Sequence, residues 1–224
     1  MKFLERYGKM LLFDQRNKVI EIARRASTEK LVPLTFGNFS LRDKETGYVC
    51  ITPSGMPYMT LETEDIVVVD TDGNIIDGKR RPSIETPLHT QIYKKRSDVF
   101  GIVHTHSTFL TAWSCLDGGM PCITTEASSL VGAALELAPF AVQGTLELAE
   151  KTSAALKDSK AVLMANHGAI FADEDIDKAY KDAFILEESA KVAYLAYTLG
   201  KPNLLSEQIM KTLKKETDKN YGQK

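Results

Sequence analysis

The chain has few of the residues that disulfide frameworks and metal sites use. Its 224 residues include four histidines, three cysteines and one tryptophan. Cys50, Cys115 and Cys122 are odd in number and lack the close paired spacing of a zinc ribbon, so neither a disulfide framework nor a cysteine-based zinc site is expected. We expect reduced thiols, as in a cytoplasmic protein.

Long hydrophobic runs and an excess of one charge are also missing. No stretch approaches the roughly 18 apolar residues of a membrane-spanning helix. Glu5, Arg6 and Lys9 interrupt the apolar N-terminal stretch before a signal-peptide core could form. The net charge of −2 gives no overall field that would attract a polyanion. We therefore expect a soluble cytoplasmic protein with no membrane partner and no nucleic-acid partner.

The composition that remains is that of a globular protein. Hydrophobic residues make up 43% and charged residues 26%, both close to the averages for such proteins, and no internal repeat is visible. Apolar residues recur at helical spacing over 5–29, and helices are also predicted over 84–95, 144–157 and 173–199. Short β-rich runs alternate with turn dipeptides over 37–76. This order predicts a single domain over 1–224, an α/β layered sandwich with a mostly antiparallel central β-sheet flanked by helices.

Two of the histidines stand one residue apart in the sequence GIVHTH, at the end of a β-branched apolar run. Side chains two apart on a strand point to the same face, so His104 and His106 are expected to project together. His167 follows a second apolar run, and Gly168 after it permits a tight turn. Three neutral imidazoles with an open position are the ligand set of a catalytic zinc site. From spacing alone, the alternative is a set of histidines without a metal.

The helix predicted over 84–95 opens with Glu85, which follows Ser83 in the sequence PSIETPLH. Because the helix dipole favours a carboxylate in the first turn, simple capping also explains this position. His89 lies four residues further on and can share the helix face of Glu85. We interpret His89 as structural or as a residue behind the ligands, because the other three histidines already complete a set.

Three turns carry small hydroxyl or amide side chains: FGNFS at 36–40, ITPSG at 51–55 and RPSIE at 81–85. In such turns, backbone N–H groups can converge on an anion. Each turn alone is ordinary. Together, in a chain without a basic patch, they indicate a phosphate pocket.

As a set, the motifs GNFS, ITPSG, PSIE, HTHS and NHG resemble the class II aldolase/adducin family in their order and approximate separation. This family includes L-fuculose-1-phosphate aldolase and L-ribulose-5-phosphate 4-epimerase. The resemblance extends from the first helix to the Tyr-Gly near the C-terminus and implies the fold of that family. It also implies a homotetramer with the active site at a subunit boundary.

The resemblance further implies roles for individual residues. Zn²⁺ is expected on His104, His106 and His167, with Glu85 as the proton carrier and as a metal ligand when substrate is absent. The residues expected to contact the substrate phosphate are Gly37, Asn38, Ser54, Gly55, Ser83 and Ile84. Tyr221 matches the family's terminal tyrosine and is expected to act in catalysis. The implied reaction is reversible cleavage of a ketose 1-phosphate to dihydroxyacetone phosphate and an aldehyde.

The chain departs from the family pattern at several positions. Ile84 stands where a second serine is usual, which leaves only its backbone N–H for the phosphate. Thr125 and Gln143 stand where the fuculose phosphate enzyme has aromatic residues, so the resemblance does not predict which aldehyde is released. The epimerase pattern has aspartates at the positions of Glu85 and Ser128, and glutamate at position 85 therefore favours cleavage.

Two alternatives to the aldolase remain. The first is L-ribulose-5-phosphate 4-epimerase or another phosphosugar lyase or dehydratase of the same family. The second is a non-enzymatic interaction domain similar to the adducin head, which lacks the metal ligands. The three histidines and Glu85 argue against this second alternative.

Overall fold

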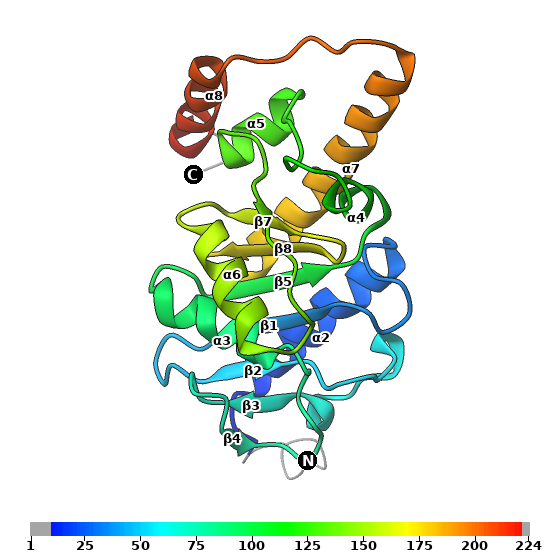
Figure 1. Ribbon diagram of the computed structural model, residues 1–224. Coiled ribbons are helices and arrows are strands. Elements are labelled where there is room, and N and C mark those ends of the chain that lie inside the picture. Colours follow the sequence, from blue (N-terminus) through cyan, green and yellow to red (C-terminus); the bar gives the residue numbers. More distant parts are fainter. Residues whose placement is uncertain (1–9, 221–224) are drawn as a thin grey trace.

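The computed structural model describes residues 10–220 and is built around one eight-stranded β-sheet. The strand order is β4-β3-β2-β1-β5-β8-β7-β6 (Figure 1). The strands are β1 (Asn38–Arg42), β2 (Val49–Ile51), β3 (Val67–Val69), β4 (Ile75–Asp77), β5 (Gly101–Thr105), β6 (Leu137–Ala138), β7 (Ala161–Met164) and β8 (Gly168–Asp173). Every neighbouring pair is antiparallel except β6 and β7. The prediction of a mostly antiparallel central sheet is therefore confirmed.

Helices cover both faces of this sheet (Figure 1). One face packs against α3 (Thr86–Lys95) and α6 (Leu146–Leu156), and the other against α2 (Phe13–Thr28), α4 (Thr108–Ser114) and α7 (Ile176–Leu199). The helices α5 (Thr125–Val131) and α8 (Glu207–Asn220) pack on each other beyond the β6 end. Two short 3₁₀ turns, η1 (Tyr58–Thr60) and η2 (Thr63–Asp65), connect β2 to β3.

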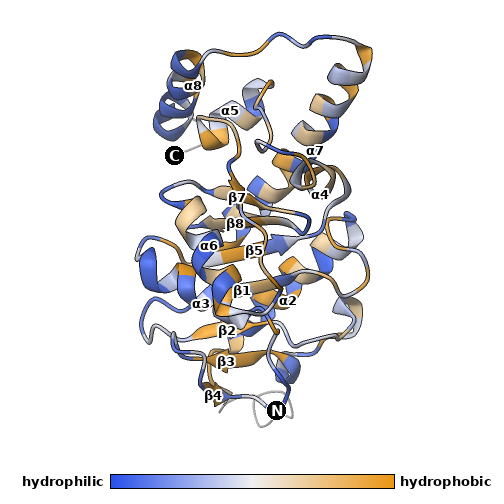
Figure 2. Cartoon of the chain, in the orientation of Figure 1, coloured by the Kyte–Doolittle hydropathy of each residue, from blue (hydrophilic) through white to orange (hydrophobic). Residues whose placement is uncertain are grey.

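The hydrophobic residues form two buried clusters, one on each side of the sheet. Alternation along the strands produces this division. In β5, for example, Val103 belongs to the cluster under α2 and α7, and Ile102 to the cluster under α3 and α6. Figure 2 shows the strands as mostly apolar and α8 as mostly polar. The layered α/β arrangement thus follows from apolar residues that alternate in strands and recur on one side of helices.

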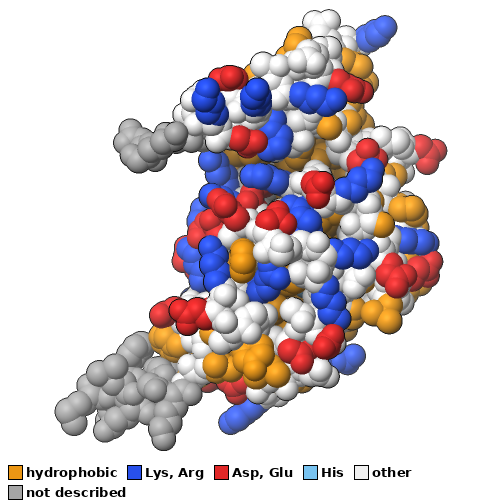
Figure 3. Space-filling model, turned by 90° about the vertical axis from the view of Figure 1, so that its left-hand side faces the viewer, with side chains coloured by type: hydrophobic (Ala, Val, Ile, Leu, Met, Phe, Trp, Pro, Cys, Tyr) orange, Lys and Arg blue, Asp and Glu red, His pale blue; other side chains and the backbone are white. Residues whose placement is uncertain are grey.

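The surface agrees with the nearly balanced composition. On the face shown in Figure 3, Lys and Arg side chains are interspersed with Asp and Glu, and no region of a single sign dominates. In the part of the chain that the structure describes, no helix combines the length and the apolar character needed to cross a membrane.

Candidate metal centre and its pocket

Three histidines predicted to act together meet where β5 ends and β8 begins. His104 lies on β5, His106 lies just after it, and His167 lies in the turn between β7 and β8. Their nearest ring nitrogens all lie within 4.8 Å of one another, and the Nε2 atoms of His104 and His106 are 2.9 Å apart. The alternating side chains of an extended chain bring the first two together, and the antiparallel pairing of β5 with β8 adds the third.

Glu85 joins this cluster from the first turn of α3. One of its carboxylate oxygens, Oε2, lies 3.2 Å from His104 Nε2, and the other, Oε1, lies 3.4 Å from His167 Nε2. Glu85 occupies the N-cap position of α3, but its side chain makes no capping hydrogen bond. The capping interpretation of this residue is therefore not supported by the geometry, because the carboxylate faces the histidines instead.

The polar atoms of the cluster fit a divalent cation. Within residues 10–220, the buried atoms Glu85 Oε1 and His167 Nε2 have no hydrogen-bond partner. His104 donates its Nδ1 proton to the carbonyl oxygen of Ala169 at 2.9 Å, so the Nε2 side of the ring faces the cluster. A carbonyl partner on the second ring nitrogen is the arrangement that orients metal-binding imidazoles. Buried polar atoms without partners are costly, and a cation at this point removes that cost.

Burial and the neighbouring His104 favour neutral His106 and His167 beside an ionised Glu85. Burial lowers the pKa of His106 to about 3 and the pKa of His167 to about 4, and the neighbouring His104 adds to both effects. Burial alone raises the pKa of the Glu85 carboxyl, but the facing His104, His167 and Asn38 outweigh it and hold that pKa well below its usual range. For His104, burial lowers the pKa, and the Glu85 carboxylate more than reverses this. His106 and His167 thus keep lone pairs for a metal at neutral pH.

Two glycines, Gly37 and Gly168, allow neighbouring backbone segments of the site to lie close together. A Cβ on Gly37 would lie 2.5 Å from Val32 Cγ1 and 2.8 Å from the carbonyl oxygen of His104. A Cβ on Gly168 would lie 2.3 Å from the carbonyl oxygen of Thr105. The left-handed residue of the β7–β8 turn is Asn166, with φ of 57°. Gly168 therefore permits the close approach of β8 to β5. The sequence analysis expected Gly168 to permit the tight turn, but Asn166 is the residue with the left-handed conformation there.

The three turns predicted as a phosphate pocket line one cavity of about 170 Å³ next to the cluster. All six predicted substrate contacts line it: Gly37, Asn38, Ser54, Gly55, Ser83 and Ile84. Glu85 and His106 also line this cavity. Among residues 10–220, the backbone N–H groups of Gly55 and Ile84 are not used in any hydrogen bond. The structure thus brings the histidines, Glu85 and the turn residues to one place.

Sequence reasoning named Asn38 as a phosphate contact and Gln143 as a departure from the family pattern, but it did not predict several contacts at this site. Gln143 lines the cavity, and the ring of Phe36 lies 5.8 Å from the ring of His106. Asn38 donates from Nδ2 to Glu85 Oε2 at 2.7 Å. Asn38 lies two residues before Ser40 on one strand. This spacing could have predicted that both side chains point to the same face of the sheet, toward α3 and Glu85. Tyr221 lies outside the described residues.

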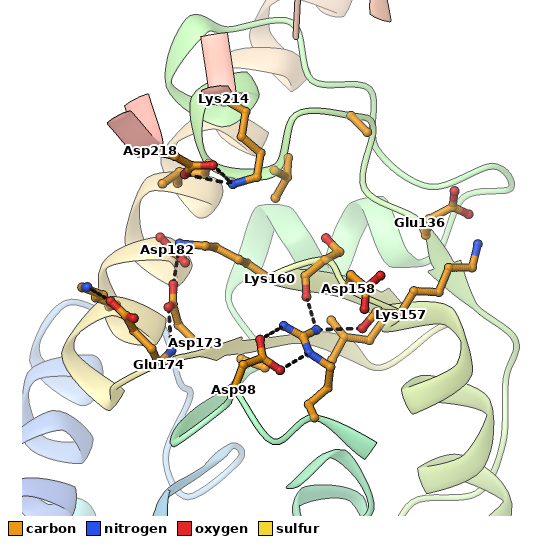
Figure 4. Close-up of a pocket in the computed structure, with 18 of the residues that line it drawn as sticks. Asp98, Glu136, Lys157, Asp158, Lys160, Asp173, Glu174, Asp182, Lys214 and Asp218 are labelled. Carbon is orange, nitrogen blue, oxygen red and sulfur yellow. Dashed lines mark hydrogen bonds and ion pairs between the residues drawn. The ribbon is translucent and has the colours of Figure 1, made fainter. Parts of the chain in front are cut away.

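A larger cavity of about 850 Å³ lies elsewhere, between the start of β7, α7 and α8 (Figure 4). None of the histidines lines it. Its charged side chains largely pair with one another: Lys160 with Asp173 at 2.7 Å, Lys214 with Asp218 at 2.9 Å, and Arg96 with Asp98 at 2.7 Å. The smaller cavity is the stronger candidate for the active site, because the three predicted turns, Glu85 and His106 all line it.

Comparison with known proteins identifies the family of this chain. The model of the class II aldolase and adducin N-terminal domain family matches residues 17–194. The chain belongs to this family. Its resemblance to the class II aldolases, stated above from five short motifs, is therefore confirmed, and so is the predicted fold.

Several class II aldolase relatives are similar over nearly their whole length. The chain is 34% identical over 214 residues to 5-deoxy-D-ribulose 1-phosphate aldolase of Bacillus thuringiensis, covering 96% of this chain and 100% of the relative. It is 38% identical over 180 residues to L-fuculose phosphate aldolase of Methanococcus maripaludis, covering 80% and 96%. A solved structure of L-fuculose 1-phosphate aldolase superposes with a TM-score of 0.90 at 31% identity, covering 93% and 98%. The prediction of an enzyme of the aldolase class is confirmed by these relatives.

Proposed function

We propose that this class II aldolase is zinc-dependent and reversibly cleaves a ketose 1-phosphate to dihydroxyacetone phosphate and an aldehyde. The observation that carries the proposal is the convergence of three imidazoles on one buried carboxylate, next to a cavity that His106, Glu85 and three polar turns line. The names of the relatives support the phosphorylated ketose: they are aldolases for 5-deoxy-D-ribulose 1-phosphate and L-fuculose phosphate.

In this proposal, His104, His106 and His167 hold the divalent ion, and Glu85 is a fourth ligand when substrate is absent. Nitrogen and oxygen donors of this kind suit zinc, although other first-row ions share the preference. When bound, such an ion acts as a Lewis acid that stabilises the negative charge left on the sugar as the bond between C3 and C4 breaks.

Glu85 is the proton carrier of the proposed reaction. In the cleavage direction, the C4 hydroxyl group loses its proton as C4 becomes the aldehyde carbon, and the electron pair of the C3–C4 bond passes to the dihydroxyacetone phosphate fragment. C3 must then gain a proton, so the net proton transfer is from the C4 hydroxyl group to C3. The Glu85 carboxyl group delivers that proton, and in the synthesis direction its carboxylate removes it. Its position at the wall of the cavity, only 4% exposed, supports this role. We also propose Tyr221 as a catalytic group of the C-terminal tail, on the resemblance alone.

The phosphate is held in this proposal by the turns at Gly37–Asn38, Ser54–Gly55 and Ser83–Ile84. The unused N–H groups of Gly55 and Ile84 are donors suited to phosphate oxygens. Ile84 contributes no hydroxyl group, so its part in binding is limited to its N–H. The binding energy of the phosphate then positions the bond that breaks.

The epimerase alternative has less support from the residues of this chain. An epimerase makes and breaks the same bond but must rejoin the fragments after the aldehyde rotates, which calls for further proton-handling groups. Ser128, at the position where the epimerase pattern has an aspartate, is fully buried and carries no ionisable group. An adducin-like interaction domain gives no reason for the histidines and Glu85 to converge.

We propose a homotetramer that works in the cytoplasm. Apolar side chains on α7, including Val192, Leu195 and Leu199, are about half exposed or more, and burial against a second copy accounts for them. The cysteines are free, as expected where thiols are kept reduced. A monomer in analytical ultracentrifugation contradicts the tetramer.

Product analysis tests the proposed reaction. The zinc-loaded protein is incubated separately with 5-deoxyribulose 1-phosphate, fuculose 1-phosphate, ribulose 5-phosphate and methylthioribulose 1-phosphate, and the products are identified by mass spectrometry. Dihydroxyacetone phosphate and an aldehyde from one of the 1-phosphates support the aldolase. Xylulose 5-phosphate from ribulose 5-phosphate, or loss of water from the methylthio sugar without cleavage, contradicts it.

A further inference from the structure

A buried line of hydrogen bonds runs from Glu85 into the core. Asn38 Nδ2 donates to Glu85 Oε2 at 2.7 Å. Behind it, Asn38 Oδ1 lies 2.5 Å from His89 Nε2, and His89 Nδ1 lies 2.6 Å from Ser40 Oγ. The hydroxyl group of Tyr93 lies 2.9 Å from Ser40 Oγ. We call these five residues the relay; each is at most 5% exposed.

The direction of every bond in the relay follows from its end at Glu85. An ionised carboxylate only accepts, so the Asn38 amide must present its NH₂ group to Glu85 and its oxygen to His89. His89 must then carry its proton on Nε2 and accept at Nδ1, where Ser40 is the donor. The Tyr93 hydroxyl group donates to Ser40, either to Oγ or to the carbonyl oxygen at 3.1 Å. The protein thus specifies one tautomer of His89.

Electrostatics agrees with a neutral His89 that is not a metal ligand. Burial lowers the pKa of His89 to about 3, and the nearby His104 adds to the effect. When His104 carries a single proton, that proton is on Nδ1, which donates to the carbonyl oxygen of Ala169. This is the opposite tautomer to that of His89. The two histidines therefore perform different tasks.

We propose that His89 is a positioning residue that acts through Asn38 to fix the carboxylate of Glu85. The proposal rests on the function proposed above. If the His89 donor were absent, the Asn38 amide could rotate and place its oxygen against Glu85 Oε2, and the carboxylate would turn away. With the donor in place, Oε2 is anchored and Oε1 is left without a partner, facing His167 at 3.4 Å. The relay thus selects which carboxylate oxygen is available to the metal and to the substrate.

The variants that test this differ in where they place a donor. His89→Gln can reach Asn38 with an amide N–H, whereas His89→Asn, one methylene shorter, retains a group only near Ser40. His89→Phe keeps a ring of similar shape without donor or acceptor. Thr90→Val is the matched control, because Thr90 is equally buried on α3 and its hydroxyl group bonds only to the backbone carbonyls of its own helix turn.

The first measurement is the rate at which zinc-loaded protein exchanges the C3 proton of dihydroxyacetone phosphate with deuterated water. At full zinc occupancy, kcat is expected to fall about tenfold to a hundredfold in His89→Phe and His89→Asn, the size that misplacement of a reacting group causes. KM is expected to stay within about twofold, because the phosphate contacts are intact. His89→Gln and Thr90→Val are expected to retain most of the activity. If His89→Phe and His89→Asn match Thr90→Val, the proposal is overturned.

A second measurement is independent of turnover. The chain has four histidines, so ¹⁵N-histidine labelling gives a simple spectrum of long-range ring correlations. His89, assigned as the signal lost in His89→Gln, is expected to show a proton on Nε2 alone. This pattern should be lost in Asn38→Ala, which removes the oxygen that accepts from Nε2, but kept in Thr90→Val. A proton on Nδ1 in the wild type overturns the relay. If the wild type exchanges no proton at all, the proposed function fails, but the relay can still be tested by the tautomer of His89 and by a cobalt spectrum. For the latter, the visible spectrum of the Co²⁺-loaded His89→Phe protein is compared with that of Co²⁺-loaded Thr90→Val. Identical spectra overturn the relay.

Discussion

Replacement of Glu85 by glutamine isolates the proton carrier from the metal site. The carboxylate of Glu85 lies 3.2 Å from His104 Nε2 and 3.4 Å from His167 Nε2, and it accepts a hydrogen bond from Asn38 at 2.7 Å. Glutamine has nearly the same shape and keeps an oxygen that can accept from Asn38. It cannot carry a proton at neutral pH, and it removes the negative charge from the cluster.

The size of the expected effect follows from these contacts. Loss of a positioned general acid–base group costs about a hundredfold to ten-thousandfold in rate, which corresponds to about 2.7–5.5 kcal/mol in the activation barrier. The three imidazoles remain, so zinc should stay at one ion per chain. Glu85→Asp is the matched control, because it keeps the charge but withdraws the carboxylate by one methylene, and we expect a smaller loss.

Exchange of the C3 proton of dihydroxyacetone phosphate is the assay of choice, because it needs no knowledge of the aldehyde. ¹H NMR in deuterated water follows the signal directly at matched zinc occupancy. We expect Glu85→Gln to exchange at least about a hundredfold more slowly than the wild type. Exchange within about threefold of the wild-type rate, with zinc bound, is too small a change for the loss of a proton carrier and would refute the reasoning.

Two further predictions concern stability, and both are tested by urea unfolding. Gly37 has φ of +117°, and a Cβ there meets Val32 and the His104 carbonyl, so Gly37→Ala should lose at least about 2 kcal/mol. Gly55→Ala, with φ of +69° and no atom within 4 Å of its Cβ, should lose only about 1–2 kcal/mol; the reverse order contradicts the close approach at Gly37. Burial raises the pKa of Asp182 to about 7, above its unfolded value of about 3.9. The folded protein therefore holds a proton that the unfolded chain releases, and this contribution to stability is lost as pH rises from about 4 through 7. Asp182→Asn should flatten that slope and stabilise the protein at pH 8, and an unchanged slope contradicts the assignment.

Most of the fold was predictable from the sequence because local patterns and tertiary packing agree. The helices predicted over 84–95, 144–157 and 173–199 correspond to α3, α6 and α7. The helix predicted over 5–29 corresponds to α2, which begins at Phe13 within the described residues. The strand β8 was missed, because its run GAIFAD follows β7 after only three residues and leads directly toward the helix predicted from residue 173. Its place between β5 and β7 comes from long-range pairing that a single sequence does not contain.

The candidate site was predictable in its parts but not in its connections. The alternation of His104 and His106 indicated a shared face, and that pair is indeed close. The position of Glu85 suggested helix capping as readily as chemistry. The structure distinguishes the two, because the Glu85 carboxylate makes no capping bond and faces His104 and His167. His89 was interpreted as structural or as a residue behind the ligands, and its bonds to Asn38 and Ser40 agree. The roles of these residues stay proposals.

The stoichiometry of zinc binding tests the central claim most directly, namely that the ring nitrogens of His104, His106 and His167 hold one divalent ion. Chelator-treated wild-type protein and the His104→Ala variant are titrated with zinc by isothermal calorimetry, and zinc K-edge absorption reports the ligands. The account predicts one ion per chain on nitrogen and oxygen ligands, with affinity at least about tenfold weaker in His104→Ala. Absence of zinc binding in the wild type, or equally tight binding in the variant, contradicts the account.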